Sequence, residues 1–380
     1  MNIETLLVRA GVERDSTTGA ISTPIYQSAT FQHPELGVST GYDYSRTANP
    51  TRTALEEAIA ALEQGARGFA FSSGMAAITT VLFLFKPGDH LVVSEDLYGG
   101  TYRLLAQVFS EFGIQASFVD TSCTKEIEAA IRPDTRALFI ETPTNPLMKI
   151  TDLEKAVVLA RTYGLLTIID NTFMTPYLQR PLTYGADIVL HSATKYLGGH
   201  NDTVAGLVVT RDAELGERIG LLQNACGAIL GPQDAWLILR GLKTLAIRIE
   251  KQQQNALAIA EWLQRHPAVE TVYYPGLSGH PNREVAERQA SGFGGMLSFS
   301  VHDPDIVPHV LKNVKVITFA ESLGGVESLI TFPARQTHAD IPEEVREHLG
   351  ITDRLLRLSV GIENANDLIL DLEEALYVKK

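Results

Sequence analysis

The chain of 380 residues contains only two cysteines, Cys123 and Cys226, and no cluster of Cys and His residues with the spacing of a zinc site. Two cysteines cannot form a disulfide framework, and a zinc site needs three or four grouped ligands. We therefore expect neither a disulfide nor a bound metal, as is typical of proteins of the reducing cytoplasm.

Positive charge is also scarce, because 32 Lys and Arg residues stand against 45 Asp and Glu, a formal net charge of −13. Binding to nucleic acid or to an anionic membrane requires clustered basic residues, so neither partner is expected. No apolar run approaches the roughly 18 residues of a membrane-spanning helix, and residues 1–7 lack the pattern of a signal peptide. The 45% content of hydrophobic residues instead predicts a globular chain, long enough for two domains.

One lysine, Lys195, occupies an unusual place in the pattern. It follows an apolar run at residues 188–190, stands after Ser192 and Thr194, and precedes a glycine pair at residues 198–199. A partly desolvated lysine has a lowered pKa and can form a Schiff base with an aldehyde, which is how pyridoxal 5'-phosphate (PLP) is held. From the residues alone, a surface lysine after a strand remains the alternative.

An acid follows a second buried run, since residues 165–169 lead directly into Asp170 without a turn residue. The protonated pyridine nitrogen of PLP is a partner for such a carboxylate. A strand-end cap on the following turn is the alternative interpretation.

Two more patterns fit a ligand with a phosphate and a carboxylate. A small-residue turn at residues 72–78 enters a predicted helix, where free backbone amides suit a phosphate group. Arg357 lies within the apolar run 355–360, and a buried guanidinium requires an anion such as the α-carboxylate of an amino acid. The alternatives are an ordinary strand-to-helix connection for the first and a structural ion pair for the second.

The order of elements predicts an α/β fold. Strands expected at residues 68–71, 90–94, 115–119, 137–140, 165–169, 187–190 and 206–210 alternate with helices such as 50–64, 125–131 and 152–163. Repeated strand–helix units imply a large, mainly parallel sheet with ligands at the carboxyl ends of its strands. A long helix over 239–262 then leads to a smaller C-terminal α/β domain, with strands at 271–274, 295–300, 315–319 and 355–360.

Three segments, 170–172, 192–196 and 199–200, resemble the signature of the transsulfuration family of PLP-dependent enzymes. The resemblance is collinear from residues 23–26 to 357–361. It implies the PLP-dependent transferase fold of type I, similar to aspartate aminotransferase. It also implies an N-terminal arm over 1–53 that reaches a neighbouring subunit, a PLP-binding domain over 54–240, and a linking helix with a C-terminal domain over 241–380.

The resemblance assigns roles to single residues. It implies that Lys195, Tyr98 and Asp170 are catalytic, as the Schiff-base lysine, the stacking ring and the partner of the pyridine nitrogen. The implied contacts to PLP are made by Tyr44, Arg46, Gly74, Met75, Tyr98, Asn145, Asp170, Thr172, Ser192, Thr194 and Lys195. The implied contacts to substrate are made by Arg103, Glu321, Ser322 and Arg357.

The family acts on small sulfur amino acids, and γ-elimination on cystathionine is our first expectation, because γ-acting members tend to carry Glu at position 321. Alternatives are γ-replacement by a cystathionine synthase or an O-acylhomoserine thiol-lyase, and β-elimination. From a different class, a non-catalytic binding protein with the same fold is the rival hypothesis. Gly100 stands where the methionine γ-lyase branch has Cys, and Asn201 where the family commonly has Ser. The expected assembly is a homotetramer, built of dimers that share active sites.

Overall fold

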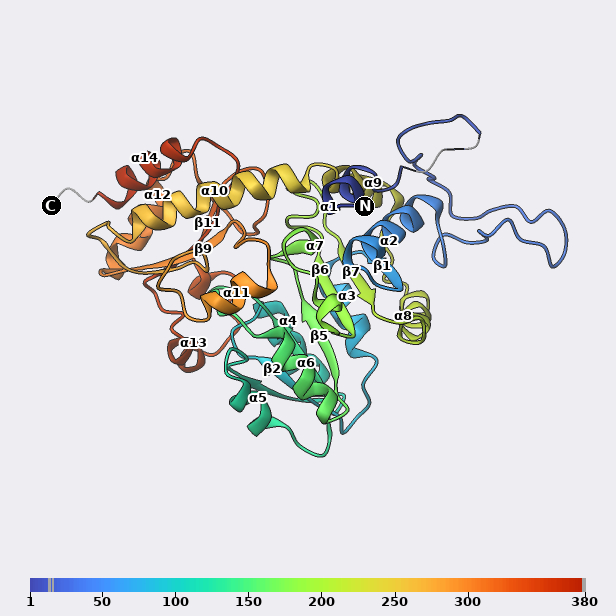
Figure 1. The fold of residues 1–380 in the computed structure, drawn as a ribbon, viewed down its shortest axis with the longest axis horizontal. Helices are drawn as coiled ribbons and strands as arrows, with labels where there is room; N and C mark the ends of the chain where they lie inside the picture. Colours follow the sequence, from blue (N-terminus) through green and yellow to red (C-terminus); the bar gives the residue numbers. More distant parts are fainter. Residues whose placement is uncertain (13–14, 16, 378–380) are drawn as a thin grey trace.

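A computed structural model describes residues 1–12, 15 and 17–377, which form two α/β parts joined by a long helix (Figure 1). The strands of the first part are β1 Arg67–Phe71, β2 His90–Ser94, β3 Gln115–Val119, β4 Thr135–Glu141, β5 Leu166–Asp170, β6 Ile188–Ser192 and β7 Gly206–Thr210. Those of the second are β8 Val269–Tyr273, β9 Met296–Val301, β10 Thr318–Phe319, β11 Leu329–Thr331 and β12 Leu355–Ser359.

Helices surround both sheets. The first half of the chain contributes α1 Ile3–Val8, α2 Pro50–Glu63, α3 Gly74–Leu82, α4 Gly99–Arg103, α5 Thr124–Ala130, α6 Leu153–Thr162 and α7 Thr175–Leu178. The second half contributes α8 Ala213–Cys226, α9 Pro232–Leu242, α10 Leu245–Leu263, α11 Arg283–Gln289, α12 Val307–Asn313, α13 Glu343–Leu349 and α14 Ala365–Leu376. Among these described residues, no helix is both long and apolar enough to cross a bilayer, and no group of three or more His, Cys, Asp or Glu is placed to hold a metal.

The first sheet has the strand order β1-β7-β6-β5-β4-β2-β3. Strands β6, β5, β4, β2 and β3 are parallel neighbours, which confirms the predicted mainly parallel sheet. Strand β7 differs from the expected pattern, because it runs antiparallel to both β1 and β6. A parallel neighbour would need a crossover connection, usually a helix, whereas residues 193–205 form only turns around Lys195.

The second sheet has the order β10-β11-β12-β9-β8. The strand predicted over 315–319 is shortened to Thr318–Phe319, because the N–H groups of residues 315–317 donate to the carboxylate of Asp371 on α14 at 2.8–3.0 Å. The short strand β11 has no counterpart among the predicted strands.

The predicted helix over 239–262 is wrong as a single element, because α9 ends at Leu242 and α10 begins at Leu245. Buried Arg248 spans the break by donating to the backbone oxygens of Gly241, at 2.9 Å, and Tyr196, at 2.8 Å. Through these two bonds Arg248 holds both helices against the turn that carries Lys195. Helix α10 then continues into the second part of the molecule (Figure 1).

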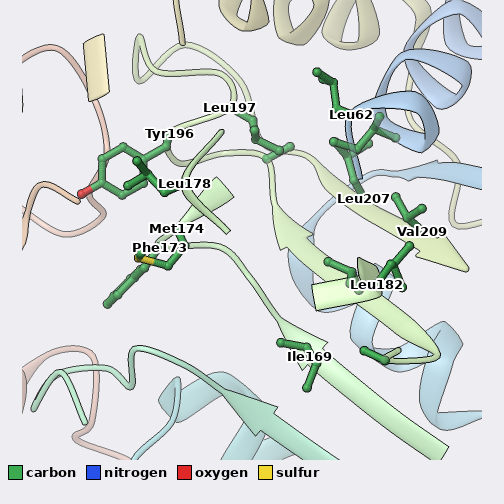
Figure 2. Packing of buried hydrophobic residues seen from close by; sticks show 14 of the residues in the cluster. Leu62, Ile169, Phe173, Met174, Leu178, Leu182, Tyr196, Leu197, Leu207 and Val209 are labelled. Atoms are coloured by element: carbon green, nitrogen blue, oxygen red, sulfur yellow. The ribbon is translucent and has the colours of Figure 1, made fainter. Parts of the chain in front are cut away.

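The segment after Lys195 is embedded in the main core. Figure 2 shows Tyr196 and Leu197 with Leu178 and Met174 among the apolar side chains of this cluster. Tyr196 is fully buried and Leu197 is 1% exposed. Because this packing fixes the backbone on one side of Lys195, the lysine side chain leaves the core in a defined direction.

Part of the chain between α1 and α2 lies outside the compact body. Residues 17–48 extend from the first part as long loops (Figure 1), and Leu36 and Tyr44 on them are exposed. A chain segment with so little burial of its own gains order only by packing on something else.

Gly324 lies where the second part touches the lysine turn, and it supplies a test of that contact. Its φ is +81°, and a Cβ there would lie 2.6 Å from the backbone nitrogen of Tyr196, whereas Gly350 has φ +85° and open space around it. Both Gly→Ala changes carry backbone strain of about 1–2 kcal/mol. We expect Gly324→Ala to lose at least about 1 kcal/mol more, because the backbone must also shift.

Urea unfolding followed by circular dichroism checks this expectation, with Gly350→Ala as the matched control. Equal shifts of the unfolding midpoint in the two variants would show that the contact at Tyr196 contributes nothing to stability.

Candidate active site

A cavity of about 320 Å³ lies where the ends of β4, β5 and β6 face the loop that follows β10. Twelve of the fifteen site residues predicted from the sequence line it: Gly74, Met75, Tyr98, Asn145, Asp170, Thr172, Ser192, Thr194, Lys195, Glu321, Ser322 and Arg357. They come from both α/β parts. The carboxyl ends of parallel strands meet at one edge of a sheet, which is where ligands bind in such folds.

Lys195 is held at the junction of the two parts. Its Nζ donates a hydrogen bond of 2.7 Å to the hydroxyl of Ser322, which has a left-handed φ of +83°. Burial lowers the pKa of Lys195 to about 8, the positive charge of Arg357 acts in the same direction, and Glu321 opposes both. A free amine is therefore available near neutral pH, as covalent chemistry with an aldehyde requires.

Asp170 ends β5 with only 8% of its surface exposed. Its Oδ1 accepts the backbone N–H of Thr172 at 3.0 Å, and burial raises the pKa of the carboxyl group. A buried acid that faces a cavity needs a cationic partner, and the protonated pyridine nitrogen of PLP fits this need.

The start of α3 forms a cradle beside β6. The hydroxyl of Ser73 caps the helix by accepting the N–H of Ala76 at 3.0 Å. A Cβ on Gly74 would lie 3.0 Å from the Cβ of Ser192, so glycine leaves the space between the helix start and β6 open. Backbone amides at a helix N-terminus, with the hydroxyls of Ser192 and Thr194 beside them, fit the phosphate group of PLP.

Tyr98 stands at the start of α4, and its backbone N–H donates to Oε2 of Glu141 at 2.9 Å. A Cβ at Gly100 would lie 2.4 Å from Cε1 of Tyr98 and 2.9 Å from the sulfur of Met75. A side chain at position 100 would therefore require the Tyr98 ring and the Met75 side chain to move. This gives a physical reason for a residue that the sequence alone marked only as a departure from one branch of the family.

Arg357 lies on β12 and is 2% exposed. Its Nη1 donates to Oδ1 of Asn145 at 2.8 Å and its Nη2 donates to the backbone oxygen of Ser322 at 3.2 Å, while its Nε is buried without a partner. Burial lowers the pKa of Arg357 to about 10. Within the described chain no carboxylate forms an ion pair with Arg357, so the structural ion pair considered from the sequence is not formed, and an incoming carboxylate would meet a free donor.

Three predicted residues lie outside the cavity of their own chain. Arg46 donates to the backbone oxygen of Asn224 at 2.7 Å, and its guanidinium lies 5.7 Å from the ring centre of Tyr44. Arg103 forms an ion pair with Asp340, and both side chains are about half exposed. A single chain therefore does not bring Tyr44, Arg46 or Arg103 into the cavity.

The sequence analysis missed Glu141, which lines the cavity at the end of β4 and is 6% exposed. The signal was available, because Glu141 follows the apolar run 137–140 in the same way that Asp170 follows 165–169. His191 also lines the cavity, and its Nε2 lies 2.6 Å from Oε1 of Glu63 in a fully buried pair. No sequence pattern links these two residues, which are far apart in the chain.

His338 was also missed, because nothing near it in sequence indicates a site. Its Nε2 lies 2.9 Å from the backbone oxygen of Asn145 and 3.2 Å from that of Leu97. Burial lowers the pKa of His338 to about 4, so the ring is neutral and donates from Nε2. One side chain of the second part thus fixes both the loop of Asn145 and the residue before Tyr98.

Comparisons with known proteins agree with this geometry. The family described as Cys/Met metabolism PLP-dependent enzyme matches residues 4–377. The chain is 58% identical over 376 residues to a cystathionine gamma-lyase of Bacillus subtilis (strain 168), covering 99% of both chains. It is 53% identical over 378 residues to a cystathionine beta-lyase of Lactococcus lactis subsp. cremoris (strain MG1363), covering 100% of both.

A solved structure shares the fold over nearly the whole chain. The crystal structure of cystathionine gamma synthase from Xanthomonas oryzae pv. oryzae in complex with cystathionine superposes with a TM-score of 0.97 at 46% identity, covering 99% of this chain and 98% of that one. These matches confirm the predicted fold and the predicted PLP-dependent enzyme of sulfur amino-acid metabolism, and they set aside the non-catalytic alternative. The chain belongs to the family of Cys/Met metabolism PLP-dependent enzymes.

Proposed function

We propose that the protein cleaves the Cγ–S bond of cystathionine, so that cystathionine and water yield cysteine, 2-oxobutanoate and ammonia. The observation that carries this proposal is the position of Glu321, an exposed residue that lines the cavity and is close enough to Lys195 to raise its pKa. A carboxylate there can accept hydrogen bonds from the ammonium group at the distal end of cystathionine. The identity of 58% to a cystathionine gamma-lyase supports the same reaction.

Bound PLP supplies an aldehyde that condenses with amines and a ring that withdraws electrons from the substrate Cα. Asp170 keeps a proton on the pyridine nitrogen of that ring. The Nζ of Lys195 removes the Cα proton and then serves the neighbouring carbons as acid and base, for which a pKa of about 8 is well matched to neutral pH.

Arg357 anchors the α-carboxylate of the substrate through its free Nε–H and the adjoining Nη groups. The bond from Nη1 of Arg357 also orients the side-chain amide of Asn145, because Oδ1 accepts it and the NH₂ group must then point elsewhere. That NH₂ group is free to donate to the phenolic oxygen of PLP. Substrate anchor and cofactor contact are therefore set by one hydrogen bond.

The phosphate end of the cavity needs a cation that its own chain does not provide. Lys195 and Arg357 are the only Lys and Arg among the described residues that line the cavity. We therefore propose a homo-oligomer, built of dimers, in which the arm over residues 1–53 brings Tyr44 and Arg46 to the phosphate in the partner's site. The division into an arm, a domain over 54–240 and a domain over 241–380 belongs to the same proposal.

The products of cystathionine cleavage test the reaction. We expect 2-oxobutanoate and cysteine in equal amounts, and we expect Lys195→Ala to lower both by about 10²–10⁴-fold because the acid and base is lost. Separate enzymatic detection of 2-oxobutanoate and pyruvate is the measurement. Pyruvate as the main product would replace the proposal by a β-lyase, and cystathionine synthesis from an O-acylhomoserine and cysteine without either keto acid would replace it by a synthase.

The pKa of Lys195 predicts how PLP uptake depends on pH. Below pH 8 the Nζ of Lys195 is mainly an ammonium group, and above it a free amine that can attack the aldehyde, so the uptake rate of the PLP-free protein should rise with a midpoint near pH 8. Glu321 raises this pKa, so Glu321→Gln should move the midpoint to lower pH. Stopped-flow absorbance measures the rate. A midpoint of about 10.4, the value of an ordinary lysine, or an upward shift in Glu321→Gln, would contradict the assignment.

Exchange of the arm predicts complementation between two impaired variants. Homo-oligomers of Lys195→Ala lack the base, and those of Arg46→Ala lack a phosphate contact, but a mixed dimer has one site free of both changes. Unfolding and refolding the two together in equal amounts should restore about a quarter of wild-type activity. The control mixes Lys195→Ala with Glu35→Gln, a change at an exposed residue of the arm. It gives the activity that results when chains without Lys195 are only diluted by chains with an intact site. No recovery beyond the activity of Arg46→Ala alone would show that Arg46 serves its own chain.

A further inference from the structure

Three buried carboxyl groups stand at the ends of three neighbouring strands. In the sheet order, β4 lies between β5 and β2. Strand β4 ends at Glu141, β5 ends at Asp170, and Asp96 follows β2. Glu141 is directly opposite Asp170 in the register of β4 and β5. The three side chains are 6%, 8% and 1% exposed, so Glu141 is a buried acid flanked by an acid on either side.

The contacts of Glu141 are those of an acceptor at a fixed position. Its Oε2 accepts the backbone N–H of Tyr98 at 2.9 Å, and its own N–H donates to the hydroxyl of Ser94 at 3.2 Å. In the described residues no Lys or Arg forms an ion pair with Glu141. The positive charge of Arg357 acts on Glu141 from a distance, but the Nη groups of Arg357 donate to Asn145, Ser322 and Thr331.

The charges around the three acids distinguish them. Burial, and then the neighbouring Asp170, raise the pKa of Glu141 well above its usual value; Asp96 adds to the rise, while the Tyr98 N–H and Arg357 oppose it. Asp96 has the positive charge of Lys149 nearby, in addition to a hydroxyl and an N–H donor. Asp170 would have the pyridine nitrogen of PLP. Only Glu141 has a carboxyl group on each side and no cation of its own, so of the three acids it is the one most favoured to stay protonated.

We propose that Glu141 is a positioning residue that remains a neutral carboxylic acid, holds the backbone of Tyr98 in place above the cofactor ring, and leaves Asp170 as the ionised acid at the pyridine nitrogen. The proposal rests on the roles given above to Asp170 and Tyr98. A charged Glu141 would place a second anion beside Asp170, and a missing acceptor would release the N–H that fixes the start of α4.

Two substitutions separate the acceptor from the charge. Glu141→Gln keeps an oxygen for the Tyr98 N–H in a neutral group, so kcat/KM between pH 6 and 9 and the visible circular dichroism of bound PLP should match the wild type. Glu141→Leu leaves a buried N–H without a partner, which costs about 1–3 kcal/mol, so kcat/KM should fall by about tenfold to a hundredfold and the circular dichroism should change. Equal losses in the two variants would overturn the proposal, because they would show that the negative charge of Glu141 is needed.

Infrared difference spectra provide a readout that requires no substrate. Wild type minus Glu141→Gln should show the C=O band of a protonated carboxylic acid at pH 7, with and without PLP, whereas Glu111→Gln, at an exposed position, should show only the bands of an ionised carboxylate. Carboxylate bands for Glu141 would overturn the proposal even if Glu141→Leu fails to fold. Since this measurement is made without cystathionine, its result is independent of whether the proposed γ-elimination is correct.

Discussion

The hydrogen bond between Arg357 and Asn145 is the contact on which the site depends. It joins β12 of the second part to the loop after β4 of the first, and both residues are almost completely buried. A guanidinium in such a place must satisfy its donors within the protein or from a ligand. The side chain of Asn145 and the backbone oxygen of Ser322 accept hydrogen bonds from Nη1 and Nη2 of Arg357. The Nε has no partner in the protein and could donate to a ligand. In the role proposed for Arg357, substrate binding would complete an existing junction between the two parts.

The same buried cation influences the reactive lysine. Arg357 is buried, so water screens its charge only weakly. This positive charge adds to the effect of burial in lowering the pKa of Lys195. Ser322 contacts both, through its hydroxyl to Lys195 and its carbonyl to Arg357, and it needs a left-handed backbone to do so. The turn that carries Ser322 thus contacts both Lys195 and Arg357, and Gly324 in the same turn has no room for a side chain because the backbone of Lys195 and Tyr196 lies against it.

Much of the site could be predicted from sequence because strand ends are easy to recognise. Apolar runs that end in Asp170 or lead to Lys195 identify both the sheet and its functional edge, and the resemblance to a family assigned the remaining residues. What could not be predicted depends on contacts between distant segments. The direction of β7 follows from a turn instead of a crossover, the break between α9 and α10 follows from the reach of Arg248, and the buried pair of Glu63 and His191 leaves no local pattern.

One departure from the family pattern lies in the turn after Lys195. Asn201, where Ser is common, has a left-handed φ of +55° and donates to Glu327 at 2.7 Å; a Cβ on Gly325 would lie 2.3 Å from its amide nitrogen. Asn adopts this backbone conformation more readily than Ser, and Asn201 is not among the described residues that line the cavity. The change therefore concerns packing between the lysine turn and the glycine-rich turn. The proposal that the reaction breaks the Cγ–S bond rests instead on Glu321, which lines the cavity.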